Sequence, residues 1–344
     1  MPKTLNFVKN DVETEALIEK IIDAVGGVLH KNIVREMMIC ALKAGQETSY
    51  LPDLRMLNST MKEMRYTNKI FSPYRHKKKV TIFGSARTAP DDFSYRACVE
   101  FSRRLVEKGY MIITGGGPGI MHAGNEGAGS DNSFAVNISL PFEQSANIVM
   151  VNTPKLITYK YFFNRKVAFV KESDAIAVFP GGFGTLDEAM EVFTLIQTGK
   201  TTPKPLLLMD NESGYWEDWL DFIKFKLLGE GFISADDFSI FTITRDVEEA
   251  IKVIDDFYSN YHSHRFVNGK LVIRLNKVLT DAQVTSLETA FPEIIVEGSR
   301  IRKTAPLPEE FDEPETHHLA RLILDFDHHH YGLLIAFIRQ LNLF

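Results

Sequence analysis

A predicted strand, a glycine-rich turn and the start of a predicted helix follow one another in Ala175-Ile176-Ala177-Val178-Phe179-Pro180-Gly181-Gly182-Phe183-Gly184-Thr185-Leu186-Asp187-Glu188. The apolar run Ala175–Phe179 has the length and branching of a buried strand. Apolar residues then recur at helical spacing in Leu186–Gln197. Glycines let the backbone approach a ligand, and the unpaired amides of a helix's first turn attract anions. The segment therefore predicts an anion-binding turn, with the hydroxyl of Thr185 beside it and Glu188 about one helical turn further on.

Strands and helices alternate on both sides of this segment, from Lys79 to about residue 258. Short strands separated by single helices are typical of a parallel, doubly wound, Rossmann-like α/β sheet. Such sheets bind ligands beyond the carboxyl ends of their strands, where the winding direction reverses. The predicted strands are Val80–Phe83, Tyr110–Thr114, Phe134–Ser139, Ala175–Phe179 and Pro205–Met209, and the predicted helices are Phe93–Lys108, Ile120–Gly127, Tyr159–Lys171, Leu186–Gln197 and Tyr215–Leu228.

Two further glycine-containing turns each follow a predicted strand: Gly84-Ser85 and Gly115-Gly116-Gly117-Pro118-Gly119. Because the carboxyl ends of parallel strands share one edge, we expect both turns to lie beside Pro180–Glu188. The longer turn does not satisfy the dinucleotide-binding pattern G-x-G-x-x-G. Gly199-Lys200-Thr201 resembles the end of a P-loop, but it follows a helix instead of opening one, and we interpret it as that helix's C-terminal cap.

The flanking regions differ from this central pattern. Residues 1–78 predict a helical segment that serves as a cover or an oligomerisation element, with helices at Ala16–Val25, Ile33–Leu42 and Leu54–Phe71. Gly26-Gly27 should end the first helix, and Gly45 should cap the second. We interpret Arg75–Lys79 as a solvated basic linker, with a phosphate-binding edge as the alternative.

Residues 261–344 predict a small α+β domain, with a regulatory or oligomerisation role. Its expected connector is His262–Gly269, and Thr304–Glu315 should be a loop. Three consecutive histidines, His328–His330, cannot all face one metal ion on a regular element, so we expect a polar turn before the last helix. The expected strands are Lys270–Leu275, Ile294–Glu297 and Arg321–Phe326, and the expected helices are Asp281–Ala290 and Tyr331–Leu341.

Composition narrows the classes of function. The formal net charge of -6 argues against nucleic-acid or acidic-membrane binding as the main role. Cys40 and Cys98 are too few for a disulfide framework or a cysteine-rich metal site. The polar N-terminus does not resemble a secretory signal, and no apolar run approaches the length of a membrane span. We therefore expect a cytoplasmic protein.

With these motifs in place, the sequence resembles the Lonely Guy family, the cytokinin-activating and related nucleotide phosphoribohydrolases, many of which carried the label lysine decarboxylase. Pro180–Glu188 is similar to the family signature P-G-G-x-G-T-x-x-E, Gly115–Met121 to its glycine-rich turn, and Arg165-Lys166 to its R-K pair. Arg165 and Glu188 have the spacing of the family's essential arginine and glutamate. The resemblance covers about residues 79–258, and the flanks resemble those of the longer bacterial members.

The resemblance implies hydrolysis of the N-glycosidic bond of a nucleoside 5′-monophosphate to free base and ribose 5-phosphate, without a cofactor or metal, in a homodimer or larger assembly. Glu188 would stabilise the positive charge that develops on the sugar. Arg165 would either clamp the phosphate or stabilise the departing base. Asp187 is interpreted as a helix-start acid, while Asn125 and Glu126 could face either ligand or water. The residues expected to bind substrate, chiefly its phosphate, are Gly84, Ser85, Gly115, Gly116, Gly117, Gly119, Pro180, Gly181, Gly182, Gly184, Thr185 and Lys166.

One departure from the family pattern concerns the base. Short plant-type members continue R-K-A-E-M, whereas Val167-Ala168-Phe169 follows Arg165-Lys166 here. A general purine or pyrimidine nucleotide nucleosidase is therefore favoured over a cytokinin-specific enzyme. A non-catalytic nucleotide-sensing regulator and an amino-acid decarboxylase are the competing hypotheses. A decarboxylase would need a lysine that forms a Schiff base with pyridoxal phosphate, and none stands at an evident strand end.

Overall fold

The computed structural model describes residues 12–139 and 146–344, and the chain divides into two compact units, with the boundary between Tyr66 and Thr67. The predicted three N-terminal helices are present, although the part of that prediction on residues 1–11 lies outside the described residues. Gly26 and Gly27 end the first helix with positive φ angles of 70° and 68°. Gly45 does not end the second, because it stays helical and Thr48 takes the C-cap position. The helices are α1 (Val12–Val25), α2 (Lys31–Glu47) and α3 (Leu51–Phe71).

The second unit contains a seven-stranded sheet in which every neighbouring pair is parallel. Its strand order is β4-β3-β2-β1-β5-β6-β7. The chain adds strands outward from β1 to β4, returns to place β5 on the other side of β1, and continues outward. The winding therefore reverses between β1 and β5, as a doubly wound sheet requires. The strands are β1 (Lys79–Phe83), β2 (Met111–Thr114), β3 (Ser133–Ile138), β4 (Leu156–Tyr159), β5 (Ala175–Val178), β6 (Leu206–Met209) and β7 (Thr242–Thr244).

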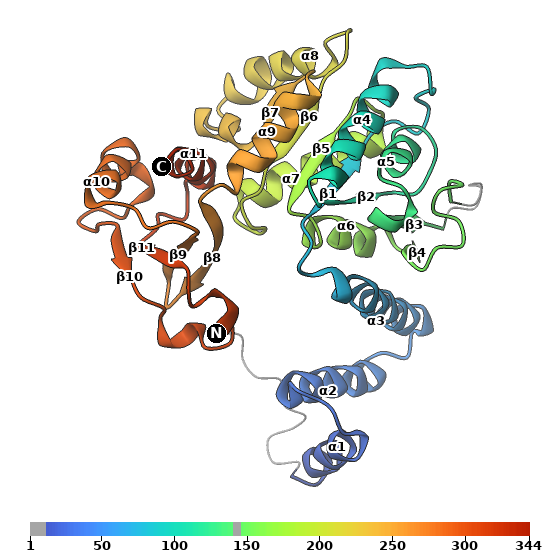
Figure 1. Cartoon of the computed structure of the whole chain (residues 1–344). Helices are drawn as coiled ribbons and strands as arrows, with labels where there is room; N and C mark the ends of the chain where they lie inside the picture. Colours follow the sequence, from blue (N-terminus) through green and yellow to red (C-terminus); the bar gives the residue numbers. More distant parts are fainter. Residues whose placement is uncertain (1–11, 140–145) are drawn as a thin grey trace. The chain divides into compact units, whose positions relative to one another are not determined.

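Helices cover both faces of this sheet (Figure 1). Successive strand residues point to opposite faces. Val80 and Ile82 accordingly join the core beneath α4, α5 and α9, whereas Phe83 joins the core beneath α6, α7, α8 and the C-terminal helix α11 (Tyr331–Leu341). The predicted α/β class is confirmed. The helices of the two faces are α4 (Phe93–Glu107), α5 (Ile120–Ala128), α6 (Phe162–Lys171), α7 (Phe183–Gln197), α8 (Tyr215–Phe222, continued by a π-helix at Ile223–Leu228) and α9 (Val247–Phe257).

A second, antiparallel sheet lies in the C-terminal part, with strand order β10-β11-β9-β8. Its core is continuous with that of one face of the large sheet, and α11 packs on α7 and on the 3-10 turn Ala235–Ile240. The three-part division at residues 78 and 260 stays a prediction. The elements are β8 (Tyr261–Val267), β9 (Lys270–Leu275), α10 (Asp281–Ala290), β10 (Arg302–Thr304), β11 (Ala320–Leu324) and α11 (Tyr331–Leu341).

Several local predictions were wrong. The expected connector His262–Gly269 is mostly β8, an edge strand in which the consecutive polar residues His262–Arg265 are not buried. Ile294–Glu297 is not a strand, because only Ile295 forms a bridge, to Phe326. The short strands β4, β7 and β10 were missed: β7 and β10 have three residues each, most of them polar, and β4 ends at Tyr159, where a helix was expected to begin.

The basic run before β1 is not simply a solvated linker. Lys79 is buried in β1, and its ammonium donates to the carbonyl of Lys77. The Lys78 ammonium lies 3.7 Å from the ring centroid of Tyr258. Burial lowers the pKa of both lysines, with Asp174 opposing. This end of the run therefore anchors the first strand. At the other end of the chain, His330 occupies the N-cap position of α11, as a polar turn would.

Candidate active site

The three turns beyond β1, β2 and β5 are joined by backbone hydrogen bonds at the reversal point of the sheet. The amide of Ser85 donates to the carbonyl of Pro180 at 3.0 Å. The carbonyl of Ser85 accepts from the amide of Ile120, also at 3.0 Å. The turn after β1 thus ties together the other two, and the predicted juxtaposition of the glycine-containing segments is present.

Some glycines in these turns are required by close packing within or between the turns. Gly119 has a φ of +64°, and a Cβ there would lie 2.3 Å from the carbonyl oxygen of Ser85. A Cβ on Gly181 would lie 2.2 Å from Oγ1 of Thr185. Nothing lies within 4 Å of the corresponding positions on Gly182 and Gly184. The open space beside this second pair is part of a cavity.

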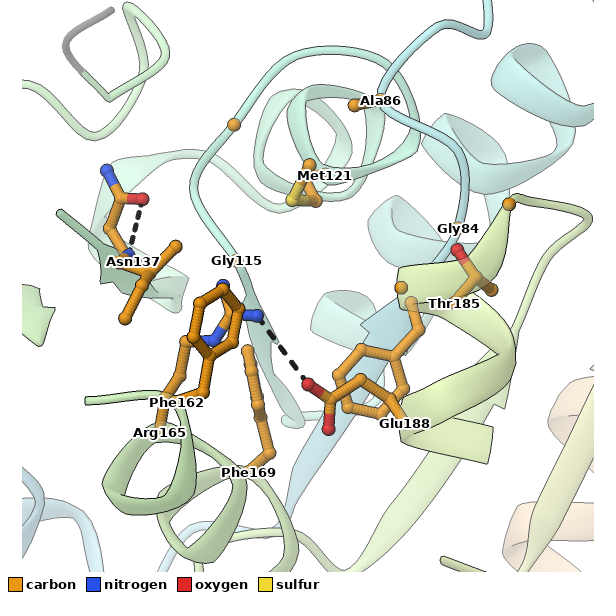
Figure 2. Close-up of a pocket in the computed structure, with 15 residues that line it drawn as sticks. Gly84, Ala86, Gly115, Met121, Asn137, Phe162, Arg165, Phe169, Thr185 and Glu188 are labelled. Carbon is orange, nitrogen blue, oxygen red and sulfur yellow. Dashed lines mark hydrogen bonds and ion pairs between the residues drawn. The ribbon is translucent and has the colours of Figure 1, made fainter. Parts of the chain in front are cut away.

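The cavity has a volume of about 260 Å³ and opens between the turns and α6 (Figure 2). Ser85, Gly116, Gly119, Pro180 and Gly181 do not line it; they belong to the packing of the turns. Lys166 does not line it either, because its ammonium is directed at the carboxylates of α7. The predicted site residues that do line it are Gly84, Gly115, Gly117, Arg165, Gly182, Gly184, Thr185 and Glu188.

The start of α7 forms one wall of the cavity. The helix begins at Phe183, three residues before the predicted start, with Gly182 as its N-cap. The Gly182 carbonyl accepts from the amides of Thr185 and Leu186 at 3.0 and 3.1 Å. The preceding amides, at Phe183 and Gly184, belong to the first turn and have no partner within the helix. They make this wall suitable for an anion.

Glu188 occupies the next turn of the same helix. Its side chain is 7% exposed. One carboxylate oxygen, Oε1, lies 3.6 Å from Nη2 of Arg165, and the other, Oε2, lies 3.1 Å from Nζ of Lys166. Burial raises the pKa of Glu188, while the charges of Lys166 and Arg165 and the hydrogen bond from Lys166 oppose that rise. The net effect is a raised pKa, as is common for carboxyl groups at catalytic sites.

Arg165 is held against two aromatic rings. Its guanidinium carbon lies 4.9 Å from the ring centroid of Phe162 and 5.6 Å from that of Phe169. A guanidinium over aromatic faces is stabilised by the ring quadrupole. All three residues come from α6, and Figure 2 shows Arg165 reaching toward Glu188 from this helix. The site thus combines a buried carboxylate, a cation and a helix start.

Comparison with known proteins agrees with this architecture. A protein-family profile described as "Possible lysine decarboxylase" matches residues 119–254. The chain is 29% identical over 182 residues to the cytokinin riboside 5′-monophosphate phosphoribohydrolase LOG1 of Arabidopsis thaliana, covering 52% of this chain and 84% of that protein. It is also 29% identical to LOG of Oryza sativa subsp. japonica, covering 48% of this chain and 67% of that protein. These matches support a Lonely Guy (LOG) family protein.

Solved structures also resemble about half of this chain. The molybdenum cofactor binding protein of Rippkaea orientalis is 19% identical, with a TM-score of 0.38, and covers 52% of this chain and 96% of its own. DNA processing protein A of Helicobacter pylori is 18% identical, with a TM-score of 0.36, and covers 52% and 81%.

The sequence did not identify every residue that lines the cavity between the turns and α6. Asn137 was detectable in principle, as a polar residue near the end of an apolar strand; its Oδ1 accepts from the Ile138 amide at 2.7 Å. The sequence did not indicate that the aromatic residues Phe83, Phe162 and Phe169 line a site, because an aromatic residue in a predicted helix or strand is ordinarily a core residue. The residues that were missed are Phe83, Ala86, Met121, Asn137, Ile138, Phe162 and Phe169.

The remaining polar candidates face elsewhere. Asn125 is buried and accepts from Thr114 Oγ1 at 2.7 Å, so it braces the turn after β2. Glu126 accepts from the hydroxyl of Tyr95 on α4. Within residues 12–139 and 146–344, no cluster of histidine, cysteine and carboxylate side chains is suited to a metal ion, and no helix is long and apolar enough to cross a membrane.

Proposed function

We propose that this LOG protein hydrolyses the N-glycosidic bond of nucleoside 5′-monophosphates, releasing the free base and ribose 5-phosphate. The observation that carries the proposal is the buried carboxylate of Glu188, which lies between Arg165 and the glycine-lined start of α7 in one cavity. The named LOG relatives act on nucleotides of this kind, cytokinin riboside 5′-monophosphates.

The expected reaction develops positive charge on the ribose. As the C1′–N bond breaks, its electron pair goes to the base, a water oxygen bonds to C1′, and the proton lost by the water ends on the base. An ionised Glu188 stabilises the cationic sugar and orients the water or the ribose hydroxyls. The phosphate binds at the start of α7, where Gly182 and Gly184 leave room and Thr185 supplies a hydroxyl.

Arg165 is assigned to the departing base. In Figure 2, Arg165 and Phe162 approach Glu188 from α6, whereas Thr185 and Gly84 lie on the other side of the carboxylate. A phosphate at the start of α7 therefore leaves the Phe162 side for the base. A guanidinium there can stabilise negative charge on the base as the bond breaks.

The decarboxylase label is a poor match for this cavity. Pyridoxal chemistry needs a lysine that forms a Schiff base. No lysine is among the described residues that line the cavity. Burial lowers the pKa of Lys166, which contacts Glu188, but hydrogen bonds to Asp187 and Glu191 and the charge of Glu188 outweigh this effect and raise that pKa. A protonated amine is not a nucleophile.

A base preference broader than cytokinin is part of the proposal. Phe169 lines the cavity and stands where short plant-type members have the methionine of R-K-A-E-M, two residues beyond Val167, which replaces the alanine. The missing glutamate of that pattern corresponds to Ala168, which is buried in the core. We therefore expect the base to be held mainly by apolar and aromatic contact.

The decisive experiment is incubation of the protein with AMP, GMP, CMP, UMP and a cytokinin riboside 5′-monophosphate, followed by chromatographic separation of base from nucleotide. We expect base and ribose 5-phosphate in equal amounts from at least one ordinary monophosphate. Binding measured by calorimetry without release of base from any of the five would instead indicate a nucleotide-sensing regulator.

A further inference from the structure

Lys166 was expected to bind the substrate phosphate, yet its contacts indicate another role. Its side chain is 15% exposed, and its ammonium contacts three carboxylates of α7. The distances from Nζ are 2.8 Å to Asp187, 3.1 Å to Glu188 and 2.7 Å to Glu191. A protonated lysine has three N–H donors. All three are therefore occupied, and none remains for a phosphate.

The contact divides the two oxygens of Glu188 between different partners. Oε2 receives the lysine hydrogen bond, whereas Oε1 lies 3.6 Å from Arg165, beyond hydrogen-bonding distance. Arg165 lines the cavity and Lys166 does not. Because neighbouring helical residues are rotated by about 100°, the two cations of α6 reach the carboxylate from different directions. Oε1 is thus the oxygen on the cavity side.

We propose that Lys166 is a positioning residue: it fixes Oε2 of Glu188 so that Oε1 faces the substrate, and Asp187 and Glu191 hold the ammonium in place. This inference rests on the proposed function. The charged groups that face Glu188 are Arg165 and Lys166 from α6, with Asp187 and Glu191 from its own helix. Glu191 also opposes ionisation of Glu188 through its charge, which raises the pKa of Glu188.

Two substitutions separate positioning from phosphate binding. Lys166→Met should lower kcat on the order of 100-fold, because a displaced carboxylate loses its alignment, while the Kd for AMP changes less than about threefold, within the spread of a lost peripheral contact. Glu191→Gln removes a negative charge and frees one lysine donor for Glu188. The acidic limb of its kcat/KM profile should therefore move to lower pH by about 0.5 to 1 unit.

Lys171→Met is the matched control, since Lys171 is a half-exposed lysine of the same helix that pairs with Glu172 and Asn68. Its kcat and acidic limb should equal those of the unmodified protein. The proposal is overturned if Lys166→Met weakens AMP binding tenfold or more at unchanged kcat, or if the limb stays in place in Glu191→Gln. Should Lys166→Met not fold, the Glu191→Gln result decides alone.

A readout without turnover separates this inference from the proposed function. Carbon-13 NMR of protein labelled at glutamate carboxyls follows the titration of Glu188, with Glu188→Gln identifying the resonance. The resonance should titrate at lower pH in Glu191→Gln and at higher pH in Lys166→Met. If no monophosphate releases base, the proposed reaction is wrong while this titration still tests the contact. If base is released but neither variant shifts the titration, only the positioning role is wrong.

Discussion

The glycine-rich turns after β2 and after β5 have similar composition but different surroundings. In the first, Gly119 is pressed against Ser85, and Gly116 has a φ of +71° with Ala135 beside it. In the second, Gly182 and Gly184 border open space. Both turns reach the cavity, the first through Gly115 and Gly117. However, Gly116 and Gly119 are held by contacts that build the edge of the sheet, whereas Gly182 and Gly184 offer an open surface at a helix start. Glycine content alone therefore does not identify a binding site; what a side chain would meet at each position does.

The largest difference between the turns should be chemical, because only the second leads into the helix that carries Glu188. Glu188→Gln keeps the size of the side chain and removes the charge. We expect kcat to fall by at least about 100-fold, the usual minimum for a group that assists proton transfer or charge stabilisation. Binding of AMP should remain, as measured by calorimetry. Near-normal turnover in this variant would remove Glu188 from the mechanism.

Gly119→Ala tests the packing role of the first turn. The new methyl group would meet the Ser85 carbonyl oxygen, in a backbone conformation that L-residues rarely adopt. We expect a loss of about 3 kcal/mol of unfolding free energy, from combined backbone strain and overpacking. Urea denaturation followed by circular dichroism measures it. A variant as stable as the unmodified protein would show that the turn relaxes easily.

Gly184→Ala is the reciprocal test on the second turn. Alanine should leave the unfolding free energy within about 1 kcal/mol, because alanine favours helices and meets no atom within 4 Å. The methyl group would, however, occupy space at the proposed phosphate wall. We expect the Kd for AMP to rise about tenfold, equivalent to about 1.4 kcal/mol. If Gly119→Ala weakens binding and Gly184→Ala does not, the contrast between the turns is reversed.

The smallest expected effect is the pH dependence of stability. Burial raises the pKa of Glu188 above its ordinary 4.5, so the folded state binds this proton more tightly than the unfolded state. The contribution of Glu188 to stability is therefore fully present below pH 4.5 and is lost as the pH rises through the folded-state pKa. The unfolding free energy of the unmodified protein minus that of Glu188→Gln should therefore decrease as the pH rises from 4.5 through the folded-state pKa. The acidic limb of kcat/KM should likewise lie above pH 4.5.

The sequence predicted the sheet well because its central strands are buried on both faces. Runs such as Ala175–Phe179 are uniformly apolar, and the turns after them carry unmistakable glycines. The edge strand β8 was missed for the opposite reason, since its residues His262–Arg265 are polar and give no apolar run. The prediction that Gly45 caps the second helix was wrong because a glycine near a helix end stops the helix only if it adopts a positive φ, which the sequence does not reveal.

The site residues were predictable only where the residue type itself indicates a chemical role. Glu188, Arg165 and the glycines stood out, and they are brought together at one edge of the sheet. Phe162 and Phe169 did not, because an aromatic residue on an amphipathic helix is ordinarily a core residue. Lys166 illustrates a different difficulty: its charge suited a phosphate, and only the three surrounding carboxylates show that its donors are already in use.

The packing of α11 on α7 has a consequence for how the chain melts. Gly332 approaches the Asp236 carbonyl so closely that a Cβ would lie 2.5 Å from it, and Ile196 of α7 shares a core with Leu334 and Ile335 of α11. Removing the last helix would expose Ile196 of α7 to water. Heating should therefore release the C-terminal sheet and the helix of Glu188 in one cooperative step. Loss of residues 261–344 would then abolish the site without touching any residue that lines it.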